Sequence, residues 1–210
     1  MGLKEDLQQL REQTGAGILD CQKALAAAGG DREKAVKVLR EKGLAKAAKK
    51  ATRVATDGTI GAYIHPGGKI GVLIEVNCET DFVAKTPEFQ QLVKDLGMQV
   101  AAAMPRYVSR EDVPAGELEA EREIYRAQAK QQGKPEKVIE KIVEGQVERF
   151  YKDYCLLEQP FIKQSDRTVK EIVDEARVRF GVNVAVRRFA RYQLGETVGK
   201  ESPAGGAPGA

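Results

Sequence analysis

The chain changes from helical to strand-like periodicity in residues 57–85, which read DGTIGAYIHPGGKIGVLIEVNCETDFVAK. Before this stretch apolar residues recur at helical spacing, whereas within it they form two β-rich runs, 59–65 and 69–78. The runs are separated by Pro66-Gly67-Gly68, and turn residues between two such runs are typical of a β-hairpin. We therefore expect a sheet to begin here, with helices before and after it.

The segment at the end of the second run, residues 77–85, is predicted to be a loop before a helix that begins at Thr86-Pro87, an N-cap followed by proline. The loop holds Glu79, Asp81 and Phe82, where ordinary turns favour Gly, Asn or Ser. Two interpretations are open. In the first, Phe82 packs into the core and Asp81 caps the next helix. In the second, Phe82 is exposed beside a carboxylate and serves as an aromatic anchor for a partner protein.

Residues 1–55 have the pattern of three short helices around a small core, and they carry a net charge of +5 from 12 basic and 7 acidic side chains. Asp31 is the predicted N-cap of the third helix, Gly43 is predicted to end it, and residues 44–53 are expected to form a helical linker. Because so small a module buries little apolar area, we expect it to dock onto another surface. Its basic stretch, 37–53, fits a solvated helix face, an acidic partner surface or, third, RNA.

The second half of the chain predicts a helical hairpin, one more helix and one more strand. Two helical patterns within about 117–155 are separated by Gly133-Lys134-Pro135. Thr168 and Glu171 have the spacing of a capping box that opens the next helix. The alternating run 182–194 follows, and we expect it to join the earlier hairpin in one antiparallel sheet.

The composition disfavours most enzyme classes and a membrane span. His65 is the single histidine, and Cys21, Cys78 and Cys155 form no C-x-x-C pair, so we expect no metal site and no disulfide framework. Gly68-Lys69 lacks the other residues of a phosphate-binding loop, so we expect no nucleotide binding. No apolar run in the middle of the chain approaches the roughly 20 residues of a membrane span, and the N-terminus lacks a signal sequence, so the expected location is the cytoplasm.

Three motifs carry a family resemblance. Residues 75–85, EVNCETDFVAK, resemble the central signature of the bacterial translation elongation factor Ts family. Residues 10–25, LREQTGAGILDCQKAL, are similar to its N-terminal signature, and residues 157–162, LEQPFI, to a run near the end of its core. The resemblance covers about residues 3–194, and two long signatures in the right order and at the right separation are highly specific.

The resemblance implies an α+β fold with a small three-helix, UBA-like N-terminal module and linker in residues 1–55. The core, residues 56–194, is then an antiparallel three-stranded sheet covered by helices, with the helical hairpin attached, and residues 195–210 are expected to be a disordered tail. The chain is shorter than the long forms of the family and holds one core subdomain in place of two. A homodimer is therefore implied, with strand 182–194 supplying part of the interface.

The function implied by the resemblance is guanine nucleotide exchange on elongation factor Tu, without a catalytic group, cofactor or metal in the chain itself. Thr80, Asp81, Phe82 and Val83 are expected to enter the GTPase domain of that partner near its magnesium and phosphate site. The resemblance also implies that the N-terminal module docks to the same partner. The docking residues carried over are Leu10, Arg11, Thr14, Gly15, Gly17, Asp20, Lys23 and Lys50.

The chain departs from the family at two positions. Relatives often carry lysine where this chain has Gln22 and, less regularly, where it has Gln8, so basic contacts at those positions are not carried over.

The alternative function is a nucleic-acid-binding accessory protein that uses the basic N-terminal module. We expect no direct nucleic-acid binding, because no aromatic residue lies among the charges of 37–53. A small enzyme is the other rival, and the missing motifs disfavour it.

Overall fold

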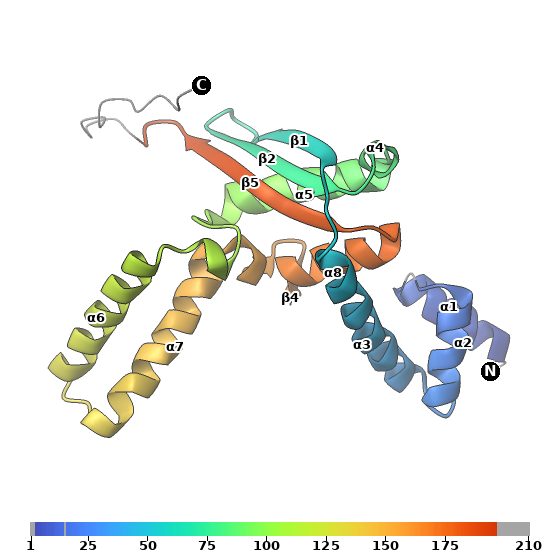
Figure 1. Cartoon of the computed structure of the whole chain (residues 1–210), viewed down its shortest axis with the longest axis horizontal. Helices are drawn as coiled ribbons and strands as arrows, with labels where there is room; N and C mark the ends of the chain where they lie inside the picture. The colour runs from blue at the N-terminus through green and yellow to red at the C-terminus, as the bar shows by residue number, and fades with distance from the viewer. Residues whose placement is uncertain (1–2, 15, 197–210) are drawn as a thin grey trace.

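The computed structural model describes residues 3–14 and 16–196, and it confirms the α+β fold (Figure 1). The helices are α1 (Leu3–Thr14), α2 (Ile18–Ala27), α3 (Arg32–Ala51), α4 (Asp81–Ala84), α5 (Pro87–Ala103), α6 (Ala115–Gln131), α7 (Glu136–Tyr154) and α8 (Val169–Phe180). The strands are β1 (Asp57–Ile64), β2 (Ile70–Cys78), β3 (Pro160–Phe161), β4 (Gln164–Thr168) and β5 (Val184–Gln193). Two short 3₁₀ turns, Arg110–Asp112 and Leu156–Glu158, lie before α6 and after α7.

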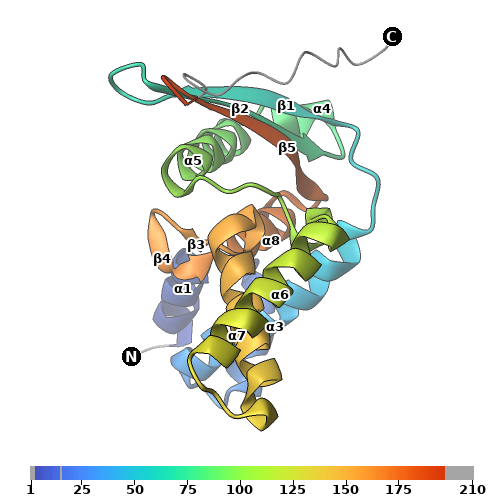
Figure 2. The same ribbon diagram turned by 90° about the vertical axis from the view of Figure 1, so that its left-hand side faces the viewer.

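The sheet is antiparallel with the strand order β1-β2-β5, as expected, and α5 covers one of its faces (Figure 2). Alternate residues of β2 such as Val72 and Ile74 are buried on that face, where they join Phe89 and Val93 of α5 in the main core. A Cβ atom at Gly61 of β1 would lie 2.3 Å from Cγ1 of Val93. This glycine therefore lets α5 approach the sheet closely.

The N-terminal module has its own core, separate from the main one. The buried residues of the module core are Leu10, Cys21, Ala24, Leu25, Ala35 and Leu39.

A glycine inside a helix costs only about 1 kcal/mol relative to alanine, so a helix continues through it where other contacts compensate. The third helix, α3, does not end at Gly43, so the expected break and separate linker are wrong. The helix is supported on both sides of Gly43, by α8 and by the turn that follows α8. Arg40 forms an ion pair with Glu171, and Nζ of Lys50 donates a hydrogen bond to the carbonyl oxygen of Gly181. These contacts hold the module against the rest of the chain through one continuous helix.

The predicted helical hairpin is present as α6 and α7, which project from the core at the end opposite the N-terminal module (Figure 1). Its base is held by Arg110, which forms ion pairs of 2.7 Å with Glu148 and with Glu158. The Arg110 guanidinium also lies 4.7 Å from the centroid of the Tyr151 ring. The hairpin is therefore anchored at its root by both charge and ring contacts.

The capping box before α8 is confirmed. Oγ1 of Thr168 accepts a hydrogen bond from the backbone nitrogen of Glu171 at 3.2 Å, and the Glu171 carboxylate accepts one from the backbone nitrogen of Thr168 at 2.9 Å. Gly181 ends the helix with a φ of 75°. The short ladder of β3 and β4 was not expected, because two paired residues leave no periodicity in the sequence. Gly15 and residues 197–210, most of the expected tail, lie outside the described residues.

Candidate functional site

The segment expected to be an irregular loop contains a single helical turn, α4, directly after β2. Thr80 is its N-cap, with Oγ1 accepting a hydrogen bond from the backbone nitrogen of Val83 at 3.4 Å. Val83 and Ala84 are buried in the main core and hold the turn against the sheet. Because the inward positions of so short a helix are taken by these two side chains, the preceding two residues point outward.

Phe82 is exposed over 82% of its surface, the most exposed large apolar side chain among the described residues. The interpretation in which Phe82 packs into the core is therefore wrong. Leaving a phenyl ring in water forfeits about 1.5 to 3 kcal/mol of burial free energy, which a partner surface would recover. The ring thus has the position of an interface anchor.

Asp81 is also exposed, and its carboxylate lies 2.6 Å from Nζ of Lys85. This contact raises the pKa of Lys85. The expectation that Asp81 caps the next helix is wrong, because Thr86 does so by accepting a hydrogen bond from the backbone nitrogen of Phe89 at 3.3 Å. Asp81 is thus free to exchange its lysine for a group on a partner, since an exposed ion pair is worth at most about 1 kcal/mol.

Two side chains outside α4, the buried Cys78 and the exposed Gln90, hold the backbone of the turn. The thiol of Cys78 donates a hydrogen bond to the carbonyl oxygen of Thr80 at 3.2 Å, and burial raises the pKa of this thiol, so it keeps its proton. Nε2 of Gln90, on α5, donates to the carbonyl oxygen of Ala84 at 2.6 Å. The backbone of the turn is therefore held at both ends while Phe82 projects into solvent.

The docking residues expected in the N-terminal module lie in two settings. Arg11 and Lys23 are exposed and available to a partner. Leu10 is fully buried and Oγ1 of Thr14 donates a hydrogen bond to its carbonyl oxygen, so both shape the module from within. Gly17, the N-cap of α2, gives no side-chain contact.

Two further docking candidates are already engaged by groups of the same chain. Asp20 forms a 2.8 Å ion pair with Lys46, and the hydrogen bond from Lys46 lowers the pKa of Asp20. Lys50 is held by the carbonyl oxygen of Gly181. These residues therefore support the module and its attachment. In Figure 1 the module and α4 lie toward the same end of the molecule, away from the hairpin.

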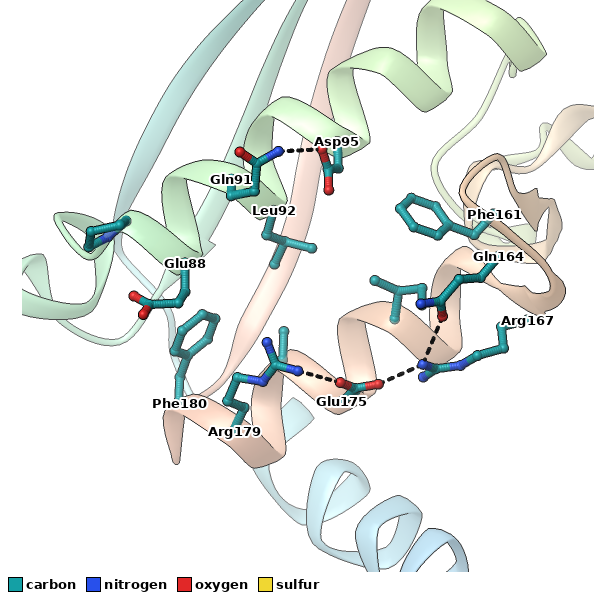
Figure 3. Close-up of a pocket in the computed structure, with 13 residues that line it drawn as sticks. Glu88, Gln91, Leu92, Asp95, Phe161, Gln164, Arg167, Glu175, Arg179 and Phe180 are labelled. Carbon is teal, nitrogen blue, oxygen red and sulfur yellow. Dashed lines mark hydrogen bonds and ion pairs between the residues drawn. The ribbon is translucent and has the colours of Figure 1, made fainter. Parts of the chain in front are cut away.

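A cavity of about 500 Å³ lies between α5 and α8 (Figure 3). Several of its polar side chains bind one another: Gln91 donates a hydrogen bond to Asp95, and Glu175 forms ion pairs with both Arg167 and Arg179. Leu92, Phe161 and Phe180 are among its apolar lining residues. Because Asp95, Arg167, Glu175 and Arg179 are already paired within the chain, we place the candidate site at the exposed turn α4.

Comparisons with known proteins show the family of the chain. The family model Elongation factor TS matches residues 9–196. The chain belongs to the elongation factor Ts family. Curated proteins named elongation factor Ts are similar over nearly their full length. That of Desulforamulus reducens is 59% identical over 194 residues, which cover 92% of this chain and 89% of the relative. That of Moorella thermoacetica is 60% identical over 193 residues, covering 92% and 95%.

Membership of the elongation factor Ts family confirms the resemblance inferred from the signatures and makes the chain an elongation factor of translation. Within residues 3–14 and 16–196, no helix is long and apolar enough to cross a membrane. Nor do the described His, Cys, Asp and Glu side chains gather into a group of three that could hold a metal ion. What the family signature alone did not reveal is the support of the turn by Gln90, which no spacing in the sequence links to Ala84.

Proposed function

We propose that this chain is a guanine nucleotide exchange factor for elongation factor Tu, and that it acts through the turn Thr80–Val83. The observation that carries the proposal is the exposed Phe82 on a rigidly held turn, in a chain that belongs to the elongation factor Ts family. Because the turn that carries this largely exposed ring is already fixed in the free protein, binding does not have to order its backbone. Phe82 is thus suited to enter a pocket of a partner.

The proposed mechanism needs no covalent step. The Phe82 ring enters between helices of the partner's GTPase domain and displaces backbone that supports the magnesium ion. Because that ion neutralises the nucleotide phosphates, its loss weakens GDP binding. Asp81, released from Lys85, adds a negative charge close to the phosphates and orients the turn. The chain itself supplies binding surface, with no catalytic group and no cofactor of its own, and it works in the cytoplasm.

The N-terminal module provides the second contact with elongation factor Tu in this proposal. Its net charge of +5 favours an acidic surface and accelerates encounter. The rival role in nucleic-acid binding loses support, because four basic side chains of the stretch 37–53 already have partners within the chain. These pairs are Arg40 with Glu171, Lys46 with Asp20, Lys50 with the carbonyl of Gly181, and Arg53 with Glu79.

Thermodynamic reciprocity tests the exchange function. If the chain weakens GDP binding to elongation factor Tu, GDP must weaken binding of the chain by the same factor, and couplings of this kind are typically about 1 to 3 kcal/mol. We therefore expect the Kd for elongation factor Tu, measured by calorimetry, to rise at least about fivefold when GDP is saturating. An affinity that is the same with and without GDP would contradict the mechanism.

We further propose that the chain forms a homodimer through the face of the sheet that α5 leaves open. Apolar side chains from all three strands are exposed on that face, among them Ile60, Leu73 and Tyr192. Large apolar side chains gathered on one exposed face often mark an interaction surface. Two such sheets stacked about a twofold axis would bury each other's apolar side chains at a spacing of about 10 Å.

Replacing Leu73 with glutamate is expected to convert the dimer to a monomer, because each copy would place a charge in the apolar interface. Ile124→Glu is the matched control: Ile124 on α6 is 48% exposed and Leu73 is 50% exposed. Sedimentation equilibrium gives the mass of each variant. A wild-type monomer, or a Leu73→Glu protein that stays dimeric, would contradict the proposed interface.

A further inference from the structure

Asn183, in the connection between α8 and β5, joins two parts of the chain that are far apart in sequence. Its side chain is almost fully buried, and Nδ2 donates hydrogen bonds to the carbonyl oxygens of Ala51 at 3.3 Å and Arg53 at 2.7 Å. Oδ1 of Asn183 accepts a hydrogen bond from Nε of Arg177 at 3.1 Å. Both ends of the amide are thus used to bind the C-terminal end of α3 to the core.

Glu79, the residue before the N-cap of α4, binds to the same junction. Its Oε1 accepts a hydrogen bond from the backbone nitrogen of Asn183 at 2.5 Å, and its Oε2 lies 3.6 Å from the guanidinium of Arg53. One carboxylate therefore contacts the connection before β5 and the segment after α3. It does so immediately before Thr80, where the exposed turn begins.

We propose that Glu79 is a positioning residue that fixes the turn bearing Phe82 relative to the end of α3, and hence relative to the N-terminal module. The inference rests on the proposed exchange function, in which the turn and the module contact one partner together. If the turn and the module are held at a fixed distance and orientation, both can contact the partner at once. A turn without this support would have to be ordered on binding, which costs free energy. Displacement of a working group by about 1 Å can cost as much as 100-fold in rate.

The other side-chain supports of α4 reach different elements. Cys78 and Gln90 bind the backbone of the turn to the sheet and to α5. Neither reaches the end of α3. One route from the module to Phe82 therefore runs through Asn183 and Glu79, beside the one along the chain into β1, which pairs with β2.

The test compares GDP release from elongation factor Tu by the full-length chain and its variants, as the rate at rising factor concentration. Glu79→Ala is expected to lower the apparent kcat/KM about tenfold. Glu79→Gln keeps an oxygen that accepts from the Asn183 nitrogen and loses only the charge facing Arg53. We expect it to recover to within about threefold of the wild type. Rescue of this kind would not follow from a role in charge alone.

Glu158→Ala is the matched control for the loss of a half-buried ion pair. The Glu158 and Glu79 side chains are 22% and 21% exposed, and Glu158 pairs with Arg110 at the base of the hairpin. We expect this control to exchange at the wild-type rate while its melting temperature falls about as much as that of Glu79→Ala. If the alanine variant does not fold, Glu79→Asp takes its place in the comparison with Glu158→Ala. It keeps the charge but withdraws the carboxylate by one methylene, and we expect it to release GDP more slowly than the wild type.

A double-mutant cycle with Phe82→Ala separates this inference from the exchange function. If Glu79 acts through the turn, Glu79→Ala has almost no further effect once the ring is gone. Wild-type exchange by Glu79→Ala, an equal loss in Glu158→Ala, or a full additional loss in the Phe82→Ala background would each overturn the positioning role. If instead Phe82→Ala exchanges normally or the wild type does not exchange at all, the proposed function itself fails.

Discussion

Replacing Phe82 with alanine is expected to slow the exchange activity about 30-fold or more while leaving the melting temperature of the free protein nearly unchanged. The ring is 82% exposed, and surface substitutions usually change stability by no more than about 0.5 kcal/mol. An interface anchor, by contrast, contributes about 2 kcal/mol or more to a complex, which corresponds to a factor of about 30. Stopped-flow fluorescence of labelled GDP and calorimetric melting measure the two quantities.

Phe89→Ala is the matched control, because Phe89 lies seven positions later and is fully buried. Its removal is expected to cost about 3 to 5 kcal/mol of unfolding free energy. Asp81→Asn removes the charge at the turn while keeping the size of the side chain, and we expect a smaller loss of about tenfold in exchange. A Phe82→Ala protein that melts much earlier yet exchanges normally when folded would show that the ring serves the fold and not the partner.

Deletion of residues 1–55 is expected to weaken binding to elongation factor Tu at least about 100-fold while leaving the core folded. The main core contains buried residues between Val72 and Val184 only, and the module has a separate core. The truncated chain loses the second of two linked contacts, so the effective concentration that joins them is lost as well. Circular dichroism reports folding of the core, and calorimetry with elongation factor Tu reports affinity.

Point variants in the module distinguish docking from support. Arg11→Ala and Lys23→Ala remove exposed charges without disturbing the module core, and each is expected to weaken binding by a smaller factor than deletion. If the truncated chain binds with full affinity, or if it unfolds while both point variants bind normally, the module supports the core and does not dock.

Much of the fold could be predicted from local patterns. The hairpin, the helix that begins at Thr86 and the capping box at Thr168 all depend on residues close in sequence. The last strand was predicted from its own alternating pattern, although it pairs with β2, more than a hundred positions earlier. The helix that continues through Gly43 could not be predicted, because its support comes from Glu171 on a distant helix. Tertiary contacts there outweigh the helix propensity of one glycine.

At the candidate site, too, one part could be predicted from the sequence and another depends on contacts in the fold. The signature around Phe82 identified the turn, but the residues alone left open whether the ring is buried or exposed. That choice depends on Val83 and Ala84 taking the inward positions of a one-turn helix. The link from Glu79 to Asn183 joins residues more than a hundred positions apart, so no local sequence pattern predicts it.

Release of GDP from elongation factor Tu tests the central claim most directly. Labelled GDP bound to elongation factor Tu is mixed in a stopped-flow instrument with excess unlabelled GDP and rising concentrations of this chain. Exchange activity predicts that the release rate rises with the concentration of the chain and saturates, and that the Phe82→Ala protein fails to reproduce the rise. A release rate that stays at its spontaneous value at every concentration of the folded wild-type chain would contradict the account.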